Sequence, residues 1–197
     1  MTCQMLCGGV MLSKRVFTPS DRRELMMIFR LLFAALTLAM IAPSQVYAFD
    51  HHGGQSYDMK NPGHPLPHIT TGGQPSLADL EKLKKQGVKT VISLRPVAEE
   101  GGFDEQAAVE ALGMTFVRLP IAGRAGVTLD AAKSFNEIMN GLEGKALVHC
   151  ASSNRVGAMF ALREHMNGAS ADKALKLGEK AGLSSLKPIV QGLMSAH

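Results

Sequence analysis

The stretch Lys145-Ala-Leu-Val-His-Cys-Ala-Ser-Ser-Asn-Arg-Val-Gly-Ala-Met-Phe160 indicates the fold of this 197-residue chain. Its apolar start is typical of a buried strand, and the part after Arg155 is typical of a helix. A short loop of small residues joins the two, with Cys150 at its start. Backbone N–H groups in such a loop and the beginning of the helix both attract an anion. The stretch therefore predicts a nucleophilic cysteine thiolate beside an oxyanion site.

Strands and helices alternate along the rest of the chain. β-branched runs, such as Val88-Lys-Thr-Val-Ile-Ser-Leu94, precede segments that carry apolar residues at helical spacing. We expect strands at 68–71, 88–94, 114–119 and 145–149, and helices at 76–86, 103–112, 128–140, 155–166, 171–181 and 186–196. This order predicts an α/β fold with a central, mostly parallel sheet flanked by helices. Cys150 would then lie at the carboxyl ends of the strands, where such sheets bind ligands.

The first 48 residues form a leader, and its part from residue 26 onward has the three features of a secretory signal peptide. A short basic start at 26–30 precedes an apolar run at 31–42, and Val46-Tyr-Ala48 is typical of a cleavage site. We expect cleavage after Ala48 and a periplasmic or secreted protein. The apolar run is shorter than the roughly 20 residues that a membrane-spanning helix needs, so we expect no stable membrane span after cleavage.

Excluding this leader changes the charge and the cysteine content. The whole chain has a net charge of +4, but residues 49–197 carry 16 basic and 15 acidic residues, a net charge of +1. That balance gives no electrostatic footprint for DNA or RNA, so we expect no nucleic-acid partner. The other two cysteines lie in the leader, so Cys150 has no partner for an intramolecular disulfide. Translation is expected to start at Met26 or Met27, since residues before them do not fit a signal peptide.

Residues 49–67 are rich in Gly, His and Pro. We interpret them as a flexible N-terminal arm, because they offer few apolar side chains to a core. The histidines of this arm match no standard metal-site spacing, so we expect no metal site. Residues 68–197 then form one domain, which is long enough to bury a core of its own.

The cysteine loop resembles the signature of protein tyrosine and dual-specificity phosphatases, which is His-Cys-x5-Arg. Leu147-Val-His-Cys150, followed closely by Arg155, carries this likeness. A second segment, Thr71-Gly-Gly-Gln-Pro75 with a helix and then Gly87-Val-Lys-Thr-Val-Ile-Ser-Leu-Arg95, resembles the phosphatase-like domain of bacterial beta-lactamase-hydrolase-like proteins. The likeness covers roughly residues 66–166. It implies a cysteine phosphatase-like, dual-specificity phosphatase-like architecture for 68–197.

The resemblance implies a role for each residue of the loop. Cys150 would be the nucleophile that takes the phosphoryl group, and Arg155 would grip two phosphate oxygens and stabilise the transition state. The residues expected to bind phosphate are His149, Ala151, Ser152, Ser153, Asn154 and Arg155, with Arg95 and Arg124 at the mouth of the site. The implied substrate is a phosphorylated small molecule or a phosphoprotein, and the reaction needs neither a metal nor an organic cofactor.

Several features depart from the phosphatase pattern. Only four residues separate the cysteine from the arginine. Ser153 stands where glycine is usual, and Val156 replaces a hydroxyl residue that assists breakdown of the cysteinyl-phosphate. The loop at 120–126, where such phosphatases carry a general-acid aspartate, contains no carboxylate. Asp130 is the nearest carboxylate and the candidate general acid, although an acid in the first turn of a helix commonly serves the helix dipole.

Two other functions fit the same loop. Single-domain rhodaneses use Cys-Arg-Ser-Gly-Asn-Arg-Ser, and Cys150-Ala-Ser-Ser-Asn-Arg-Val156 matches that loop in length and in its Asn-Arg pair. A tight loop suits a persulfide on Cys150, so a rhodanese-type sulfurtransferase stays open, although the flanking segments fit the phosphatase-like family better. The third alternative is a module that binds phosphate or a phosphoprotein with little or no turnover.

Overall fold

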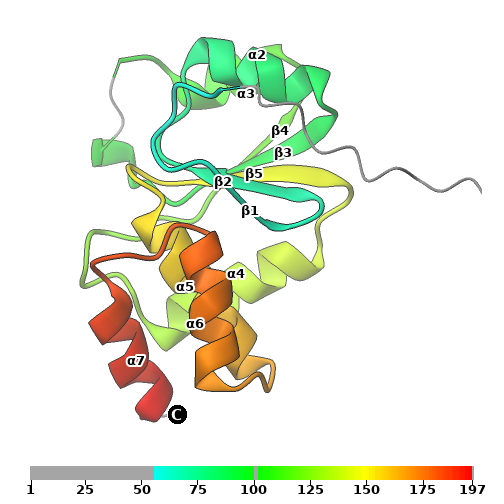
Figure 1. The fold of residues 1–197 in the computed structure, drawn as a ribbon. Helices are drawn as coiled ribbons and strands as arrows, with labels where there is room; N and C mark the ends of the chain where they lie inside the picture. The colour runs from blue at the N-terminus through cyan, green and yellow to red at the C-terminus, as the bar shows by residue number, and fades with distance from the viewer. Residues whose placement is uncertain (1–55, 100–101, 197) are drawn as a thin grey trace, which may run out of the picture. The chain divides into compact units, whose positions relative to one another are not determined.

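The computed structural model describes residues 56–99 and 102–196. The predicted leader at 1–48, its cleavage site and the first residues of the predicted arm lie outside the described residues. Within the described part, no helix is both long enough and apolar enough to cross a membrane. The elements of this part are shown in Figure 1.

Strands and helices alternate as the sequence predicts. The strands are β1 (Gly63–Leu66), β2 (Ile69–Gly72), β3 (Val88–Ser93), β4 (Thr115–Arg118) and β5 (Lys145–His149). The helices are α2 (Leu77–Lys85), α3 (Glu105–Ala111), α4 (Leu129–Asn140), α5 (Asn154–Met166), α6 (Ala171–Lys180) and α7 (Lys187–Ser195), and a 3-10 helix, η2 (Val97–Glu99), follows β3. Every predicted element is present, each with bounds that differ by two residues or fewer.

The strands form one sheet in the order β1-β2-β5-β3-β4. Neighbouring strands are parallel except for β1 and β2, which are antiparallel. The central strand β5 places His149 between Gly72 of β2 and Ser93 of β3. Because the carboxyl ends of parallel strands meet at one edge, the segments that follow β2, β3 and β4 converge near Cys150. The predicted α/β fold with a mostly parallel sheet is confirmed.

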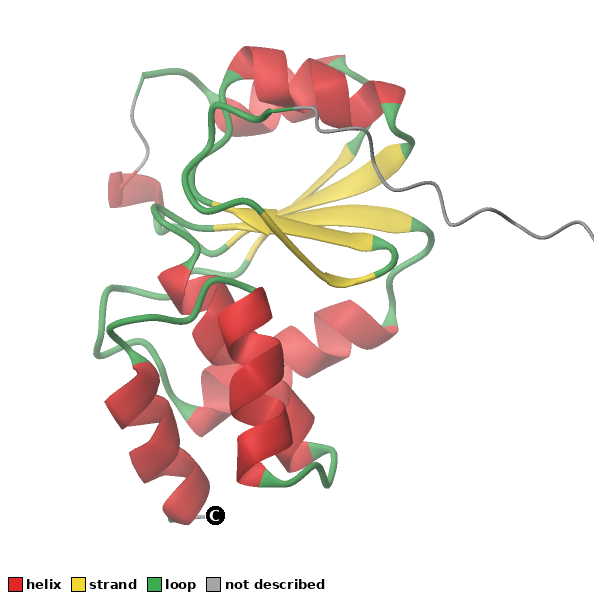
Figure 2. Ribbon diagram, in the orientation of Figure 1, coloured by secondary structure: helices red, strands yellow, loops and turns green. Residues whose placement is uncertain are grey.

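Helices cover both faces of this sheet (Figures 1 and 2). Helices α2 and α3 lie on one face, where Leu80 and Leu83 are fully buried against it. Helices α4 to α7 lie on the other face, where Phe135 and Phe160 meet edge to face with ring centroids 5.2 Å apart. All residues from 156 to 162 in α5 are buried. The strand, loop and helix around Cys150 are therefore held by a packed core.

Two glycines let α5 and α6 cross in close contact. A Cβ on Gly157 would lie 2.1 Å from the backbone nitrogen of Leu183, and a Cβ on Gly178 would lie 2.7 Å from the carbonyl oxygen of Gly157. Backbone atoms cannot give way as the end of a flexible side chain can, so larger residues do not fit at either position. This crossing fixes the amino end of α5 against the connection between α6 and α7.

The segment before β2 differs from the sequence interpretation. The sequence predicts a flexible arm at 49–67, whereas the described part of that range belongs to the domain, with β1 paired to β2. Met59 is buried in the core beside α2. Pro65 within β1 and Pro67 just after it argue against a strand in the sequence, because proline cannot donate a hydrogen bond to a ladder. An edge strand such as β1 tolerates Pro65.

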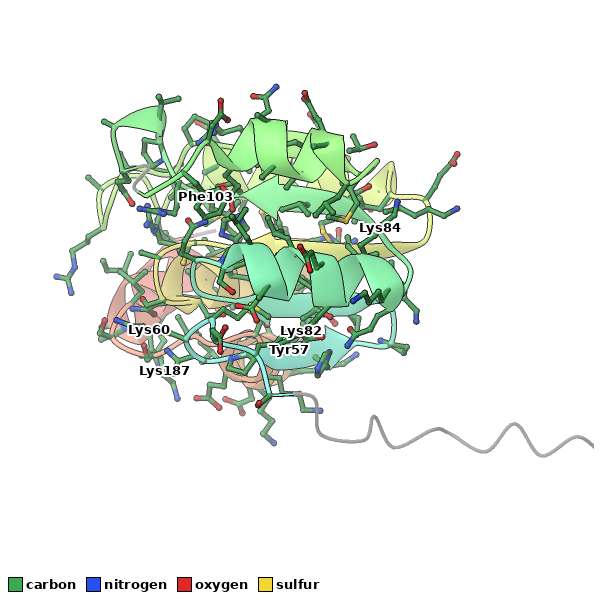
Figure 3. All side chains as sticks on the ribbon, turned by 90° about the horizontal axis from the view of Figure 1, so that it is seen from above. Tyr57, Lys60, Lys82, Lys84, Phe103 and Lys187 are labelled. Carbon is green, nitrogen blue, oxygen red and sulfur yellow. The ribbon has the colours of Figure 1, made fainter. Side chains whose placement is uncertain are left out.

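Side chains of α2 fasten this segment in place. The carboxylate of Asp79 accepts hydrogen bonds from the backbone N–H groups of Asp58 at 2.9 Å and Met59 at 3.0 Å. Lys82 donates to the carbonyl of Ser56 at 3.1 Å, and Figure 3 shows Tyr57 beside the same helix. These contacts join residues about twenty positions apart, so the periodicity of the sequence does not predict them.

Candidate active site

Cys150 leaves β5 at the carboxyl edge of the sheet, and it is buried. Its backbone N–H donates to the carbonyl of Gly72 at 3.2 Å, and Gly73 forms a bridge with Ser152. A Cβ on Gly73 would lie 2.9 Å from the carbonyl oxygen of Ala151. The second glycine of the Thr71-Gly-Gly motif is therefore what allows β2 to approach the cysteine loop.

Ser153 adopts the left-handed backbone conformation, with φ 68° and ψ −13°. A non-glycine residue there costs about 1 kcal/mol or more. The residue is fully buried, and its hydroxyl donates to the carbonyl oxygen of Ala181 at 2.7 Å. Gly182 packs so closely that a Cβ on it would lie 2.4 Å from the Cβ of Ser153. These contacts hold serine where the phosphatase pattern has glycine.

This use of the hydroxyl leaves the amino end of α5 without a side-chain cap. Helices α2, α3, α4 and α6, by contrast, are capped by Ser76, Asp104, Thr128 and Ser170, whose side chains each accept from a backbone N–H of the first turn. At α5 the first N–H groups and the positive end of the helix dipole stay available to another acceptor. The step from left-handed Ser153 to right-handed Asn154 is also the backbone pattern of an anion-binding nest.

Asn154 and Ser152 tie the loop to its neighbours. The side-chain nitrogen of Asn154 donates to the hydroxyl of Ser185 at 2.7 Å, and its oxygen accepts from the N–H of Ser184 at 2.9 Å. The carbonyl of Ser152 accepts from the side chain of Asn61 at 3.0 Å. The side chain of Asn154 is thus directed to the α6–α7 connection, and it orders the loop.

Arg155 is only 7% exposed, and its guanidinium is held on two sides. Nη1 and Nη2 donate to the two carboxylate oxygens of Glu99 at 3.0 and 2.6 Å, and Nη1 also donates to the carbonyl of Ile121 at 2.6 Å. Burial alone would lower the pKa of Arg155, but contacts with Glu99 and Cys150 raise it above its ordinary value. The cysteine and the arginine of the loop therefore lie together, as the sequence predicts.

Arg95, predicted at the mouth of the site, joins this cluster through Glu99. Its guanidinium donates to the side-chain oxygen of Gln74 and to the backbone carbonyl of Glu99. Its Nε also lies 3.9 Å from Oε2 of the same glutamate. The hydrogen bond to Arg155, aided by the charges of both arginines, outweighs burial and lowers the pKa of Glu99 below its ordinary value.

A buried pair lies beside the cysteine. His149 is fully buried, and its Nε2 lies 3.0 Å from Oε1 of Glu105, which also accepts from the amide of Gln74 at 2.7 Å. The two groups are within contact distance, although neither ring nitrogen of His149 has a well-aligned hydrogen-bond partner. Burial alone would raise the pKa of Glu105, but contacts with His149, Gln74 and Ser93 lower it below its ordinary value.

Asp130 and Arg124 lie outside this cluster. The side chain of Asp130 is 91% exposed and pairs with Lys133 at 3.0 Å in the first turn of α4. Such a position suits an acid that serves the helix dipole. Arg124 is exposed on the loop 120–126. Among the described residues, neither makes a hydrogen bond or ion pair with Cys150 or Arg155.

Glu99 and Glu105 are the carboxylates in contact with the loop and its flanking histidine, and the sequence predicts neither. Glu105 begins α3, where an acid normally serves the helix dipole. Glu99 stands in a segment without periodicity, but it follows β3, whose carboxyl end lies beside β5. Across 56–99 and 102–196, no group of three or more His, Cys, Asp or Glu is placed to hold a metal ion.

Comparisons with known proteins agree with this fold. A phosphatase family described as DSP-PTPase phosphatase fused to NAD+ kinase matches residues 46–187. The beta-lactamase hydrolase-like protein of Agrobacterium fabrum is 33% identical over 104 residues, which are 51% of this chain and 24% of that protein. The protein of that name from Xylella fastidiosa is 31% identical over the same length. The chain thus matches about a quarter of the length of these relatives.

Solved structures show the same fold. A candidate phosphatase from Neisseria meningitidis has a TM-score of 0.59 and 23% identity, and the match covers 68% of this chain and 97% of that one. A candidate phosphatase from Shewanella putrefaciens has a TM-score of 0.55 and 22% identity, with 70% and 88% covered. The resemblance inferred from the sequence is confirmed. The chain belongs to the phosphatase family described as DSP-PTPase phosphatase fused to NAD+ kinase.

Proposed function

We propose that the protein hydrolyses a phosphate monoester through a covalent intermediate on Cys150. One observation carries this proposal: the thiol of Cys150, the guanidinium of Arg155 and the uncapped start of α5 meet at the carboxyl edge of the sheet. A thiolate nucleophile, a guanidinium and free N–H groups are what phosphoryl transfer to sulfur requires. Membership in a phosphatase family supports the same chemistry.

The reaction has two steps. First, the Cys150 thiolate attacks phosphorus, so an S–P bond forms while the P–O bond to the leaving group breaks, and the departing oxygen takes a proton from water. Second, water attacks phosphorus, the S–P bond breaks, and inorganic phosphate leaves as the thiolate is restored. Arg155 and the N–H groups of the loop bind the phosphoryl oxygens in both steps.

The loop 120–126 affects the choice of substrate, because it contains no carboxylate. Without a general acid, departure of a poor leaving group slows by about 10²- to 10⁴-fold. We therefore expect the protein to hydrolyse aryl phosphates faster than alkyl phosphates. The natural substrate is a phosphorylated small molecule or a phosphoprotein.

The full chain and its Cys150→Ser variant test the proposal with two substrates. Phosphate release from an aryl phosphate, lost in the variant, is the expected result. Thiocyanate formed from thiosulfate and cyanide would overturn the proposal in favour of a sulfurtransferase. Binding of orthovanadate without any hydrolysis would instead support a phosphate-binding module. Thermal unfolding of both proteins provides the control for folding.

We further propose that the protein acts in the periplasm or outside the cell. The support is the predicted leader at 1–48, with its apolar run and small-residue cleavage site. Cells that express the full chain should yield a periplasmic or secreted form whose mass corresponds to a start at Phe49. Recovery of only the uncleaved chain from the cytosol would contradict export.

A further inference from the structure

The segment before β1 forms part of the rim of the cysteine loop. The side-chain nitrogen of Asn61 donates to the carbonyl oxygen of Ser152 at 3.0 Å, although 91 positions separate the two residues. The backbone carbonyl of Lys60 accepts from the N–H of Gly73 at 2.7 Å, and Gly73 forms the bridge with Ser152. Lys60 and Asn61 therefore lie directly beside the loop that carries the nucleophile.

Asn61 shares an uncommon backbone conformation with Ser153. Within 56–99 and 102–196, these two are the non-glycine residues with positive φ, at 48° and 68°. Asparagine adopts this region more readily than most residues, and here its side chain reaches Ser152 from it. Such conformations persist only where the surroundings determine them, and they are concentrated at active sites and ligand clamps. The segment is thus shaped to meet the cysteine loop.

Contacts on both sides hold the backbone of Lys60 at this rim. The preceding residue, Met59, is buried, and its N–H donates to the carboxylate of Asp79 at 3.0 Å. A Cβ on Gly73 would lie 3.1 Å from the Cβ of Lys60 and 2.9 Å from the carbonyl oxygen of Ala151. Both distances start from the same point, so the Cβ of Lys60 lies no more than about 6 Å from that oxygen. The side chain of Lys60 therefore begins beside the residue that follows the nucleophile.

The ammonium group of Lys60 is left without a partner. Lys60 is exposed, and its side chain makes no hydrogen bond or ion pair with any residue that the structure describes. The carboxylates that contact its segment have other donors: Asp58 accepts from the hydroxyl of Ser76 at 3.3 Å, and Asp79 is fully buried under backbone N–H groups. Figure 3 shows Lys60 towards the end of the molecule to which the strands point, and Lys84 towards the other end.

The arginines of the site, unlike Lys60, already have acceptors. Arg95 and Arg155 both contact Glu99. The buried Glu105 adds a second negative charge to the same hydrogen-bonded chain. The two positive charges of the arginines are therefore offset by two negative ones. A second anionic group on the substrate needs a cation from outside this cluster, and Lys60 lies beside the loop to supply it.

We propose that Lys60 binds a second anionic group of the substrate, which lies beside the phosphoryl group that is hydrolysed. This inference rests on the proposed function, because it narrows the class of substrate for the same site. The protein then prefers phosphorylated compounds that carry another negative charge to those that carry none. Lysine suits this use, since its flexible stem and three N–H donors can follow an anion to its position.

Two aryl phosphates that differ in charge test this role. One carries a carboxylate at the meta position of its ring, and the other carries a neutral carboxamide there. The ratio of their kcat/KM values is measured for the full chain and for Lys60→Gln, Lys60→Arg, Lys89→Gln and Arg124→Gln, so that differences between the leaving groups cancel from one variant to the next. Lys89 is the matched control, because it is exposed near the start of β3, at the opposite edge of the sheet. Arg124→Gln removes the exposed cation of loop 120–126.

The ratio of carboxylate to carboxamide substrate should fall by about 3- to 10-fold in Lys60→Gln, because a partly exposed ion pair with the substrate is lost. Lys60→Arg should keep most of the wild-type ratio, and the ratios of Lys89→Gln and Arg124→Gln should stay at the wild-type value. An unchanged ratio in Lys60→Gln would overturn the inference, even if both kcat/KM values fall together. A fall of the ratio in Arg124→Gln but not in Lys60→Gln would assign the anion to loop 120–126 and overturn it as well.

Binding measurements separate this inference from the proposed function. Calorimetry gives the dissociation constants of the same two compounds for Cys150→Ser, with Lys60 present and with Lys60→Gln added. Lys60-dependent binding of the carboxylate compound, in a protein whose wild type shows no hydrolysis, would disprove hydrolysis and support the inference. Hydrolysis with a ratio that does not depend on Lys60 would disprove the inference alone. A wild type that neither hydrolyses nor binds the two compounds would overturn both.

Discussion

Ser153 should tolerate glycine better than alanine, although alanine is closer to serine in size. Ser153→Ala keeps a side chain in the left-handed conformation at φ 68° and removes the hydrogen bond to Ala181. The carbonyl of Ala181 then loses a buried donor, which costs about 1–3 kcal/mol. Ser153→Gly loses the same bond, but it relieves about 1 kcal/mol of backbone strain. The glycine variant should therefore be the more stable by about 1 kcal/mol.

Urea and thermal unfolding of the full chain can measure this difference. About 1 kcal/mol corresponds to a shift of about 2–4 °C in Tm for a chain of this size. Ser134, which is exposed in the middle of α4, provides the matched control. Glycine there should be less stable than alanine by about 1 kcal/mol, because the backbone is helical. The order of stability should thus reverse between the two serines.

An alanine variant at Ser153 as stable as the glycine variant, or more stable, would refute this reasoning. It would mean that the residue does not hold a positive φ in solution. A loss below about 0.5 kcal/mol in Ser153→Ala would instead show that the hydrogen bond to Ala181 contributes little. The first outcome would also argue against the nest at the start of α5, since the nest depends on the same left-handed residue.

Three further predictions concern packing, pH and catalysis. Gly157→Ala should lower the free energy of unfolding, measured in urea, by about 1–3 kcal/mol, because the new Cβ would lie 2.1 Å from the backbone nitrogen of Leu183. Gly192→Ala is the control and should not destabilise the fold, because the space around Gly192 is open. Burial alone would raise the pKa of Glu105, but contacts with His149 and Gln74 lower it below its ordinary value. The ionised carboxylate therefore stabilises the fold fully above the ordinary carboxyl pKa, and this stabilisation disappears as pH falls through the lowered pKa. Glu105→Gln should therefore flatten the acid limb of stability against pH, and an unchanged limb would contradict the pair. Val156 lacks the hydroxyl that assists breakdown of the cysteinyl-phosphate, so stopped-flow assays of the wild type should show a burst of released aryl alcohol. Val156→Thr should raise the steady-state rate. A wild type without a burst would disprove slow breakdown of the intermediate.

Local signals in the sequence predict most of the fold. Ser76 and Thr128 cap their helices as expected, and the β-branched run at 88–94 forms a strand. Cys150 and Arg155 are also predictable, because four residues join them in a strand-loop-helix unit. These signals all act over a short range, because each depends on residues that lie close together in the sequence.

The remaining features depend on contacts between distant residues. Glu99 meets Arg155 across 56 positions, and Asp79 binds a segment about twenty positions earlier. Periodicity and capping rules do not reach such distances, and an isolated glutamate in a loop looks like a solvated charge. Strand β1 is not predicted for a different reason. Its proline, Pro65, is compatible with a strand only at the edge of a sheet, and edge position is a property of the whole topology.

The shortened loop is best understood through the contacts that hold it. A loop with serine in a left-handed conformation is strained, and strain persists only where the surroundings determine the conformation. Here Ala181 binds the serine hydroxyl, Asn154 binds the α6–α7 connection, and Asn61 binds the carbonyl of Ser152. These contacts come from two distant parts of the chain, the α6–α7 connection and the segment before β1, so the backbone N–H groups are fixed before any anion arrives. That preorganisation stabilises the transition state for attack on phosphorus but does not help the leaving group depart. Because no carboxylate stands on loop 120–126, the rate should depend steeply on the leaving group: a series of aryl phosphates of increasing phenol pKa should show a steady decline in kcat/KM, and a flat series would reveal a proton donor.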